Sequence, residues 1–250
     1  MTLLKIDGIK KYFEAEQGVF GKAKSVVKAL DGVSFCVNEH DTLGIVGESG
    51  CGKTTLAKII LKLLAPTEGV IDFDPKIITD FRKDVQVIFQ NPYNSLNPKM
   101  RVFDIIAEPL LIHGIAAKSG LKRRVLELLK ATGLDENALN RRPVEFSGGQ
   151  RQRICLARAL AVEPKFLILD EPISSLDLTV QVDMLDLFLA LKEKMRLTYI
   201  FISHNLAVVR YLANRIVVMR EGRIVEEGAA SRVFSAPRQD YTRLLLEAAK

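Results

Sequence analysis

The chain has 250 residues, of which 48% are hydrophobic and 26% charged, a balance typical of a globular protein with one large domain or a main domain and a subdomain. No apolar run approaches the roughly 18 residues that span a bilayer, and the first residues lack the pattern of a secretory signal, so we expect a protein in the cytosol or on the cytosolic face of a membrane. The net charge of +6 permits an anionic partner, but no basic stripe rich in aromatic residues is present, so nucleic acid is not expected.

The first part of the chain is predicted to be a β region that leads to a buried strand. Residues 3–9 predict a strand, residues 14–28 a loop or hairpin, residues 29–37 a turn followed by a strand, and residues 42–46 a buried strand. Tyr12 and Phe13 follow the first strand. An aromatic side chain here can stack on a nucleotide base or pack in the core, and the residues alone leave both readings open.

The most informative motif follows the buried strand and fits the phosphate-binding pattern G-x-x-x-x-G-K-[ST]. Glycines let the backbone turn so that successive N–H groups face phosphate oxygens, and the helix predicted at residues 55–64 adds a favourable N-terminus. Within the motif, Lys53 can reach the outer phosphates and Thr54 can ligate Mg²⁺. The sequence therefore predicts a nucleotide site formed by Gly47, Glu48, Ser49, Gly50, Cys51, Gly52, Lys53, Thr54 and the adjoining Thr55.

The middle of the chain predicts a helical insertion in an α/β core. Strands are predicted at residues 69–73 and 85–89. Gln90 ends the second of these strands, where its amide would lie near a metal or a water, or else in a surface loop. Proline and glycine punctuate residues 92–145, and helices are predicted at residues 102–111 and 121–132.

A serine-glycine-glycine turn ends the insertion. Ser147, Gly148, Gly149 and Gln150 precede a helix predicted at residues 152–161. Such a turn either offers backbone N–H groups to an anion or caps the helix.

Polar side chains follow the last two strands predicted for the core, at residues 165–169 and 197–202. Asp170 and Glu171 at a buried strand end are costly unless they hold a metal or activate water. Asp170 is suited to bind Mg²⁺ through water and Glu171 to act as a general base. His204 would contact a γ-phosphate, or else be a surface residue or a capping residue. Further predictions are a helix at residues 174–194, a hairpin at 216–227 and a short helix at 241–249.

In this order and at this spacing, the motifs resemble the ATP-binding subunit of an ABC transporter, over essentially the whole chain. The resemblance implies an α/β fold: a P-loop ATPase core with a mostly parallel sheet, an N-terminal antiparallel β part and an inserted α-helical subdomain. The core would comprise residues 1–91 and 151–235, the helical subdomain about 92–150 with the serine-glycine-glycine signature, and a short C-terminal helix 236–250, in a single ABC ATPase domain.

The resemblance also implies a role for each candidate residue, with ATP and Mg²⁺ as cofactors. Phe13, or alternatively Tyr12, would stack on adenine, and the phosphate loop would hold the phosphates. Mg²⁺ would be bound by Thr54, Gln90 and Asp170. Glu171, His204 and Gln90 would serve hydrolysis, with Gln90 coupling the site to the helical subdomain. The nucleotide held by a second subunit would be contacted by the signature Ser147, Gly148, Gly149 and Gln150, and Asp177 would lie at the dimer interface.

Three departures from the family pattern remove no required polar group, so an active ATPase is expected. Phe146 stands where leucine is usual, and Ile173 stands where threonine is usual. Thr54 and Thr55 replace the commoner serine-threonine pair.

Within the family, the chain is similar to the branch that serves oligopeptide, dipeptide and nickel or metal-chelate importers. The supporting segments are residues 89–98, 108–110 and 241–245. The end of the sequence at Lys250 favours the shorter nickel or metal-chelate members. The implied partners are two membrane-spanning permease subunits, a second ATPase subunit that is the same chain or a related sister, and, indirectly, an extracytoplasmic solute-binding protein, at the cytoplasmic face of the cell membrane.

Two other classes of protein share part of this pattern. A soluble ABC ATPase acting on nucleic acid or ribosomes would carry long coiled-coil insertions or two tandem ATPase units, and 250 residues contain neither. A small-molecule kinase would lack the serine-glycine-glycine signature. An ATPase that drives import is therefore the leading interpretation.

Overall fold

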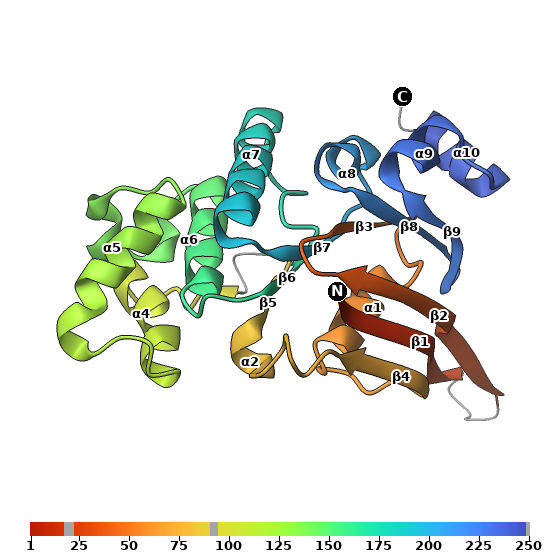
Figure 1. The fold of residues 1–250 in the computed structure, drawn as a ribbon, viewed down its shortest axis with the longest axis horizontal. Coiled ribbons are helices and arrows are strands. Elements are labelled where there is room, and N and C mark those ends of the chain that lie inside the picture. The colour runs from red at the N-terminus through yellow and green to blue at the C-terminus, as the bar shows by residue number, and fades with distance from the viewer. Residues whose placement is uncertain (18–22, 91–94, 249–250) are drawn as a thin grey trace. The chain divides into compact units, whose positions relative to one another are not determined.

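The computed structural model describes residues 1–17, 23–90 and 95–248, with only the backbone described for 15–17 and 23–25. The chain divides into two compact units (Figure 1). Unit 1 comprises Met1–Ile77 and Ile200–Lys250, and unit 2 comprises Ile78–Tyr199. Residues 91–94 of the segment that marks the importer branch lie outside the described residues.

Unit 1 begins with an antiparallel sheet. Strand β1 (Thr2–Gln17) pairs with β2 (Ala23–Asn38) and with β4 (Glu68–Phe73), in the order β2-β1-β4. Leu4 and Ile6 are buried while Lys5 and Asp7 are exposed, the alternation of a sheet with one face on the core. The strand predicted at residues 3–9 is confirmed, and it continues to Gln17. The described residues of the predicted loop or hairpin, 14–17 and 23–28, belong to β1 and β2 and pair antiparallel.

The second sheet region of unit 1 carries the predicted phosphate loop. Every side chain of β3 (Thr42–Val46) is buried, and β3 leads through the loop into α1 (Lys53–Ile60). Strand β3 is parallel to β8 (Arg215–Arg220), which pairs antiparallel with β9 (Arg223–Ala229). A Cβ at Gly44 would collide with Val209, so glycine lets α8 (Leu206–Leu212) approach β3 closely.

Two short helices of unit 1 were not predicted. They are α8 and α9 (Ala230–Ser235), of seven and six residues. Helix α10 (Asp240–Glu247) confirms the helix predicted at residues 241–249, with an earlier start and end. Helix α1 stops at Ile60 rather than at residue 64, because Lys62 adopts a left-handed conformation with φ 57°.

Unit 2 contains the strands that deliver the predicted catalytic residues. Strand β5 (Val85–Ile88) is parallel to β6 (Phe166–Asp170), and the short helix α2 (Phe81–Asp84) precedes β5. Helix α7 (Leu178–Met195) follows β6, and the chain returns to unit 1 within β7 (Thr198–Ile202). These buried parallel strands and the antiparallel sheet of unit 1 confirm the predicted α/β class.

Helices dominate the rest of unit 2. Helices α4 (Val102–Ile112), α5 (Leu121–Ala131) and α6 (Gly148–Leu160) pack against one another (Figure 1). Short 3₁₀ turns at Lys118–Gly120, Glu136–Asn140 and Pro143–Glu145 connect them. Val125 and Leu128 lie on the buried face of α5, at the spacing of one helical turn. The predicted helices at 102–111 and 121–132 are confirmed, and α6 begins four residues before the predicted start.

Candidate functional site

The phosphate loop lies between β3 and α1, and two of its glycines occupy positions where a side chain does not fit. Gly47 has φ 152°, and a Cβ there would collide with the Met219 carbonyl oxygen. Gly52 has φ 109° and abuts the Ala29 carbonyl in the same way. Glycine is thus required at both ends of the loop, both for the turn and for close backbone packing. Residues 48–50 between them are exposed to solvent.

Lys53 is buried and folds back over the loop. Its Nζ donates hydrogen bonds to the carbonyl oxygens of Gly47 at 2.7 Å and Glu48 at 2.8 Å, and lies 3.6 Å from the Cys51 sulfur. The side chain is only 6% exposed, so its charge lies within the loop. An ammonium held there is suited to bind phosphate oxygens on the solvent side of the loop. Thr54 and Thr55 follow in the first turn of α1.

The turn between β8 and β9 contacts the phosphate loop and supports it. This support was not predicted from the sequence. The Gly222 backbone N–H donates to the Cys51 carbonyl at 3.0 Å, and the Gly222 carbonyl accepts from the Asp31 N–H at 2.8 Å. The sequence showed a glycine turn at this point but carried no signal for a partner about 170 residues earlier. Through Gly222, the β8–β9 turn therefore links the phosphate loop to Asp31 of β2 within unit 1.

His204 lies at the same end of β3 as the loop. The backbone N–H of Ser203 donates to the Ile45 carbonyl at 3.2 Å, which sets the end of β7 beside the end of β3. His204 is exposed, and the next residue, Asn205, caps α8 by accepting from the N–H groups of Ala207 and Val208. The cap is thus Asn205 and not His204, and contact of the histidine with a γ-phosphate stays a prediction.

The two aromatic residues of β1 have different surroundings. The Tyr12 hydroxyl donates to Asp31 at 2.5 Å, and the Lys28 ammonium lies over its ring. This hydroxyl and the Arg223 guanidinium hold the pKa of Asp31 well below its usual value, at about 2. Phe13 is 40% exposed, with the Lys11 ammonium 5.2 Å from its ring centroid. Phe13 therefore presents the more accessible ring.

In unit 2, the parallel pairing of β5 with β6 brings two predicted catalytic residues together. Ile88 is opposite Leu169, and the Gln90 amide donates to the Glu171 carboxylate at 3.0 Å just beyond that pair. Asp170 is 3% exposed at the end of β6. Glu171 adopts a left-handed backbone conformation with φ 48°, which turns its side chain out of the strand direction. Asp170 and Glu171 are adjacent in the chain, but Asp170 is buried, whereas Glu171 is partly exposed and accepts a hydrogen bond from Gln90.

The predicted signature forms the first turn of α6. The Ser147 hydroxyl accepts from the Gln150 N–H at 3.3 Å, and the Gln150 side chain accepts from the Ser147 N–H at 3.1 Å. Gly149 is buried, and a Cβ there would collide with Val180 of α7. This reciprocal cap explains why α6 starts earlier than predicted. Ser147 stays exposed at the start of a thirteen-residue helix, so a cap and an anion site are compatible.

Asp177 caps α7, next to the signature. Its carboxylate accepts from the Val180 N–H at 3.0 Å, and Asp177 itself is exposed. Leu176 packs against Gly148, so the segment that carries Asp177 is part of the support of the signature. The structure therefore brings Gln90 and Glu171 together in unit 2, and the signature and Asp177 together in the same unit.

Oxygen donors of the kind that Mg²⁺ prefers are present in the predicted residues. They are the Thr54 hydroxyl, the Asp170 carboxylate and the Gln90 amide. Among the residues that the structure describes, no group of three or more His, Cys, Asp or Glu could hold a metal ion. Hydroxyl, carboxylate and amide oxygens suit a magnesium ion that takes several of its ligands from nucleotide phosphates and water.

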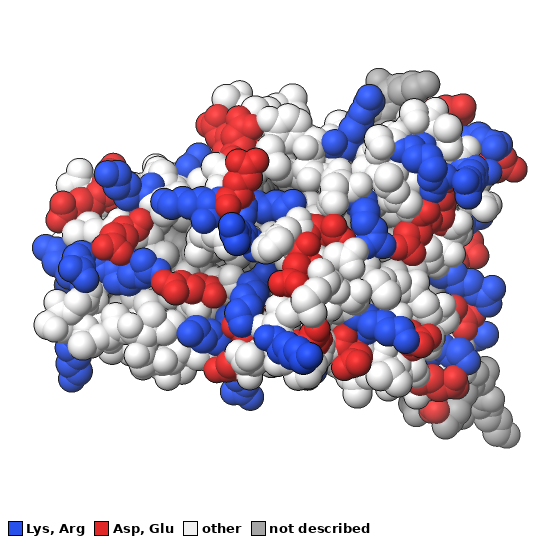
Figure 2. Space-filling model, in the orientation of Figure 1, with Lys and Arg blue, Asp and Glu red and all other residues white. Residues whose placement is uncertain are grey.

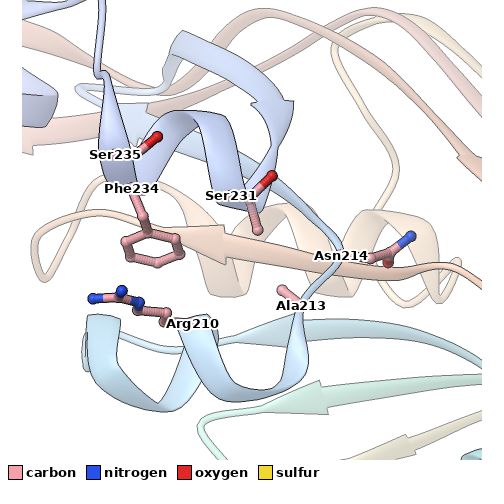
Figure 3. A pocket seen from close by; sticks show the side chains of 7 residues that line it. Arg210, Ala213, Asn214, Ser231, Phe234 and Ser235 are labelled. Carbon is pink, nitrogen blue, oxygen red and sulfur yellow. The ribbon is translucent and has the colours of Figure 1, made fainter.

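A separate hollow of 510 Å³ lies between α8 and α9 (Figure 3). The Arg210 guanidinium faces the Phe234 ring at 5.9 Å from its centroid. Asn214, on the wall of the hollow, accepts from the Thr42 N–H at 2.6 Å and donates to Asp41 at 3.0 Å. Asn214 thereby ties the hollow to the start of β3, and it lies outside the predicted nucleotide site.

Surface charge is mixed on the face that Figure 2 shows. Lysine and arginine side chains there alternate with aspartate and glutamate rather than forming one basic stripe. No helix in the described part of the chain is both long and apolar enough to cross a bilayer.

Comparison with known proteins agrees with this geometry. A family model described as ABC transporter matches residues 30–174. The dipeptide transport ATP-binding protein of Haemophilus influenzae is 41% identical, over 98% of this chain and 77% of its own length. The oligopeptide transport ATP-binding protein of Bacillus subtilis is 45% identical, over 98% of this chain and 82% of its own length.

Solved structures show the same fold. The cbiO1 protein of Clostridium perfringens, part of an ABC transporter complex, superposes with a TM-score of 0.78 at 27% identity, covering 94% of this chain and 91% of its own. A dimeric bacterial ABC transporter cassette gives a TM-score of 0.77 at 29% identity, covering 91% and 99%. The same cassette has been solved in a post-hydrolysis state bound to ADP and phosphate.

Proposed function

The chain belongs to the ABC transporter family, and we propose that it is the subunit that binds and hydrolyses ATP to power the import of small peptides. The observation that carries this proposal is the phosphate loop of unit 1 with its buried Lys53. Within unit 2, the strand-end carboxylate Glu171 accepts a hydrogen bond from Gln90, as a general base would need. The capped signature at Ser147 adds the feature that separates this family from other phosphate-loop proteins.

ATP binding would rest on the loop and α1. Backbone N–H groups at the start of α1 and the Lys53 ammonium would hold the β- and γ-phosphates. Thr54 and Asp170 would hold Mg²⁺, with Gln90 contributing, and the ion would neutralise charge that develops on the phosphates. The protein's own contribution is to fix these groups before the nucleotide arrives.

Hydrolysis would rely on Glu171 as the general base. Its hydrogen bond from the Gln90 amide fixes the carboxylate at the strand end, where it can accept a proton from the attacking water. His204, exposed beyond β7, would orient that water and contact the γ-phosphate. Coupling through Gln90 would let the helical part of unit 2 respond to the state of the nucleotide.

A second ATPase subunit would complete each site. Ser147 is exposed at the N-terminus of α6, and Asp177 is exposed at the N-terminus of α7. The Ser147 hydroxyl and the backbone N–H groups of Gly148 and Gly149 would meet the γ-phosphate of a nucleotide bound by a partner, and Asp177 would lie at the dimer interface. The partner would be either a second copy of this chain or a related sister subunit.

Peptides are the proposed cargo class because the relatives above carry dipeptide and oligopeptide transport in their names. The chain would act at the cytoplasmic face of the membrane with two permease subunits, and a solute-binding protein would supply the peptide. This ATPase subunit itself would not contact the cargo.

Adenine stacking is proposed for Phe13 rather than Tyr12, because Tyr12 is tied to Asp31. The Phe13→Ala variant should bind ATP about tenfold more weakly, since stacking of a base on an aromatic ring contributes about 1–3 kcal/mol. Isothermal titration would measure the affinity, with Tyr12→Ala as the matched variant. A larger loss in Tyr12→Ala would assign the stacking to Tyr12.

Co-purification from native membranes tests the proposed function. We expect a mild detergent extract to yield this chain with two membrane-spanning subunits and an ATPase partner, and peptide with its binding protein should raise phosphate release by that complex. Recovery with ribosomes or DNA, and without a membrane protein, would instead favour the soluble ATPase. ATPase stimulation by nickel or a metal chelate, but not by peptide, would refute the proposed cargo.

A further inference from the structure

One residue of the C-terminal helix contacts the phosphate loop. The backbone N–H of Glu48 donates a hydrogen bond to the Tyr241 hydroxyl at 3.4 Å, although 193 positions separate the two residues. Both belong to unit 1. Tyr241 is the first residue of segment 241–245, which is similar to the peptide and nickel importer branch of the family. The contact with Glu48 suggests a structural role for this segment at the phosphate loop.

The contact acts on a single peptide group. The peptide that joins Gly47 to Glu48 has its carbonyl oxygen 2.7 Å from Lys53 Nζ and its N–H directed at Tyr241. Because a peptide group is planar, a partner that fixes the N–H also fixes the direction of the carbonyl oxygen. Tyr241 therefore orients the carbonyl that holds the Lys53 ammonium.

Helix α10 is itself firmly anchored at its start. Glu226 of β9 is 6% exposed and accepts from the backbone N–H groups of Arg238 at 3.0 Å and Gln239 at 3.1 Å, with Arg232 as ion partner. Burial opposes ionisation, yet these hydrogen bonds hold the pKa of Glu226 below its usual value. The charged carboxylate thus pins the end of α10 that carries Tyr241.

The Tyr241 ring is also held in place. The Arg220 guanidinium lies 4.9 Å from its centroid, and burial raises the pKa of the Tyr241 hydroxyl, which keeps it neutral. Arg220 precedes the turn whose Gly222 N–H binds the Cys51 carbonyl. The loop is thereby held near one end by this turn and near the other by Tyr241.

We propose that Tyr241 is a positioning residue for nucleotide binding, which holds the Gly47–Glu48 peptide so that the phosphate loop is ordered before ATP arrives. A preordered loop loses less conformational freedom on binding, and the affinity rises accordingly. Tyr241 acts through the loop and does not touch the nucleotide. The inference rests on the proposed binding of ATP at this loop.

The Tyr241→Phe variant tests this role because it removes only the hydroxyl and keeps the ring on Arg220. We expect its dissociation constant for ATP, titrated without Mg²⁺ to prevent hydrolysis, to rise about threefold to tenfold, as for loss of one hydrogen bond. With Mg²⁺, KM should rise while kcat at saturating ATP stays unchanged. A purely structural role would reduce the active fraction, and so kcat, without this split.

Leu244→Ala is the matched control, because Leu244 lies on the same helix and is 64% exposed. It should leave both the ATP affinity and kcat unchanged. Wild-type ATP affinity in Tyr241→Phe would overturn the inference, as would a loss of kcat with KM unaltered. Failure of the wild-type chain to bind ATP would refute the nucleotide site itself, which the wild-type titration reveals separately.

Discussion

Lys53→Ala is expected to abolish tight ATP binding, with the dissociation constant raised about 100-fold or more, because hydrogen bonds to a charged group contribute about 1.5–3 kcal/mol each. The ammonium holds the carbonyl oxygens of Gly47 and Glu48, so its loss also frees the first half of the loop. Equilibrium titration with ATP on the folded variant measures the effect. Thermal melting of the same sample establishes that the fold survives.

Lys58→Ala provides the control for charge. Lys58 lies on the same helix, α1, but is exposed near its last turn. Its replacement should leave the affinity for ATP unchanged. Near-normal affinity in Lys53→Ala would refute the assignment of the phosphate loop.

Glu171→Gln is expected to keep ATP binding and lose hydrolysis. The amide retains an oxygen that can accept the hydrogen bond from Gln90, so the geometry at the strand end is preserved. It cannot take a proton from water, and loss of a general base typically slows a reaction about 10²- to 10⁴-fold. Phosphate release at saturating ATP and Mg²⁺, compared with the dissociation constant for ATP, separates the two properties.

Glu193→Gln is the control for loss of a negative charge in unit 2. Glu193 is exposed near the C-terminus of α7, and Glu193→Gln should hydrolyse ATP at the wild-type rate. Rapid phosphate release from Glu171→Gln would show that another group acts as the base. Loss of ATP binding in that variant would assign Glu171 to binding instead.

Local patterns predicted the strand and the helix on either side of the phosphate loop. The apolar run of β3, the glycines and Lys53 are adjacent in the chain, so strand, loop and helix follow from short-range rules. Helix boundaries were less accurate, because they depend on caps: Ser147 and Gln150 start α6 early, and Lys62 ends α1 early. Helices α8 and α9 escaped prediction because six or seven residues show too little periodicity.

Contacts between distant segments were beyond the reach of the sequence. The Gln90–Glu171 hydrogen bond depends on β5 being the parallel neighbour of β6, and the order of strands along the chain does not reveal which strands pair. The choice between Tyr12 and Phe13 likewise turned on Asp31, which binds only one of them. The contacts of Gly222 and Tyr241 with the phosphate loop also join segments far apart in the chain, so the sequence did not predict them.

The backbone conformation at Glu171 has a consequence for the stability of the fold. A residue with a Cβ in the left-handed region costs about 1–3 kcal/mol, and glycine would adopt the observed φ of 48° with little penalty. A chain selected for thermal stability alone would therefore favour glycine at this position. Glutamate at this position therefore lowers the stability of the fold, while it places a carboxylate at the end of β6.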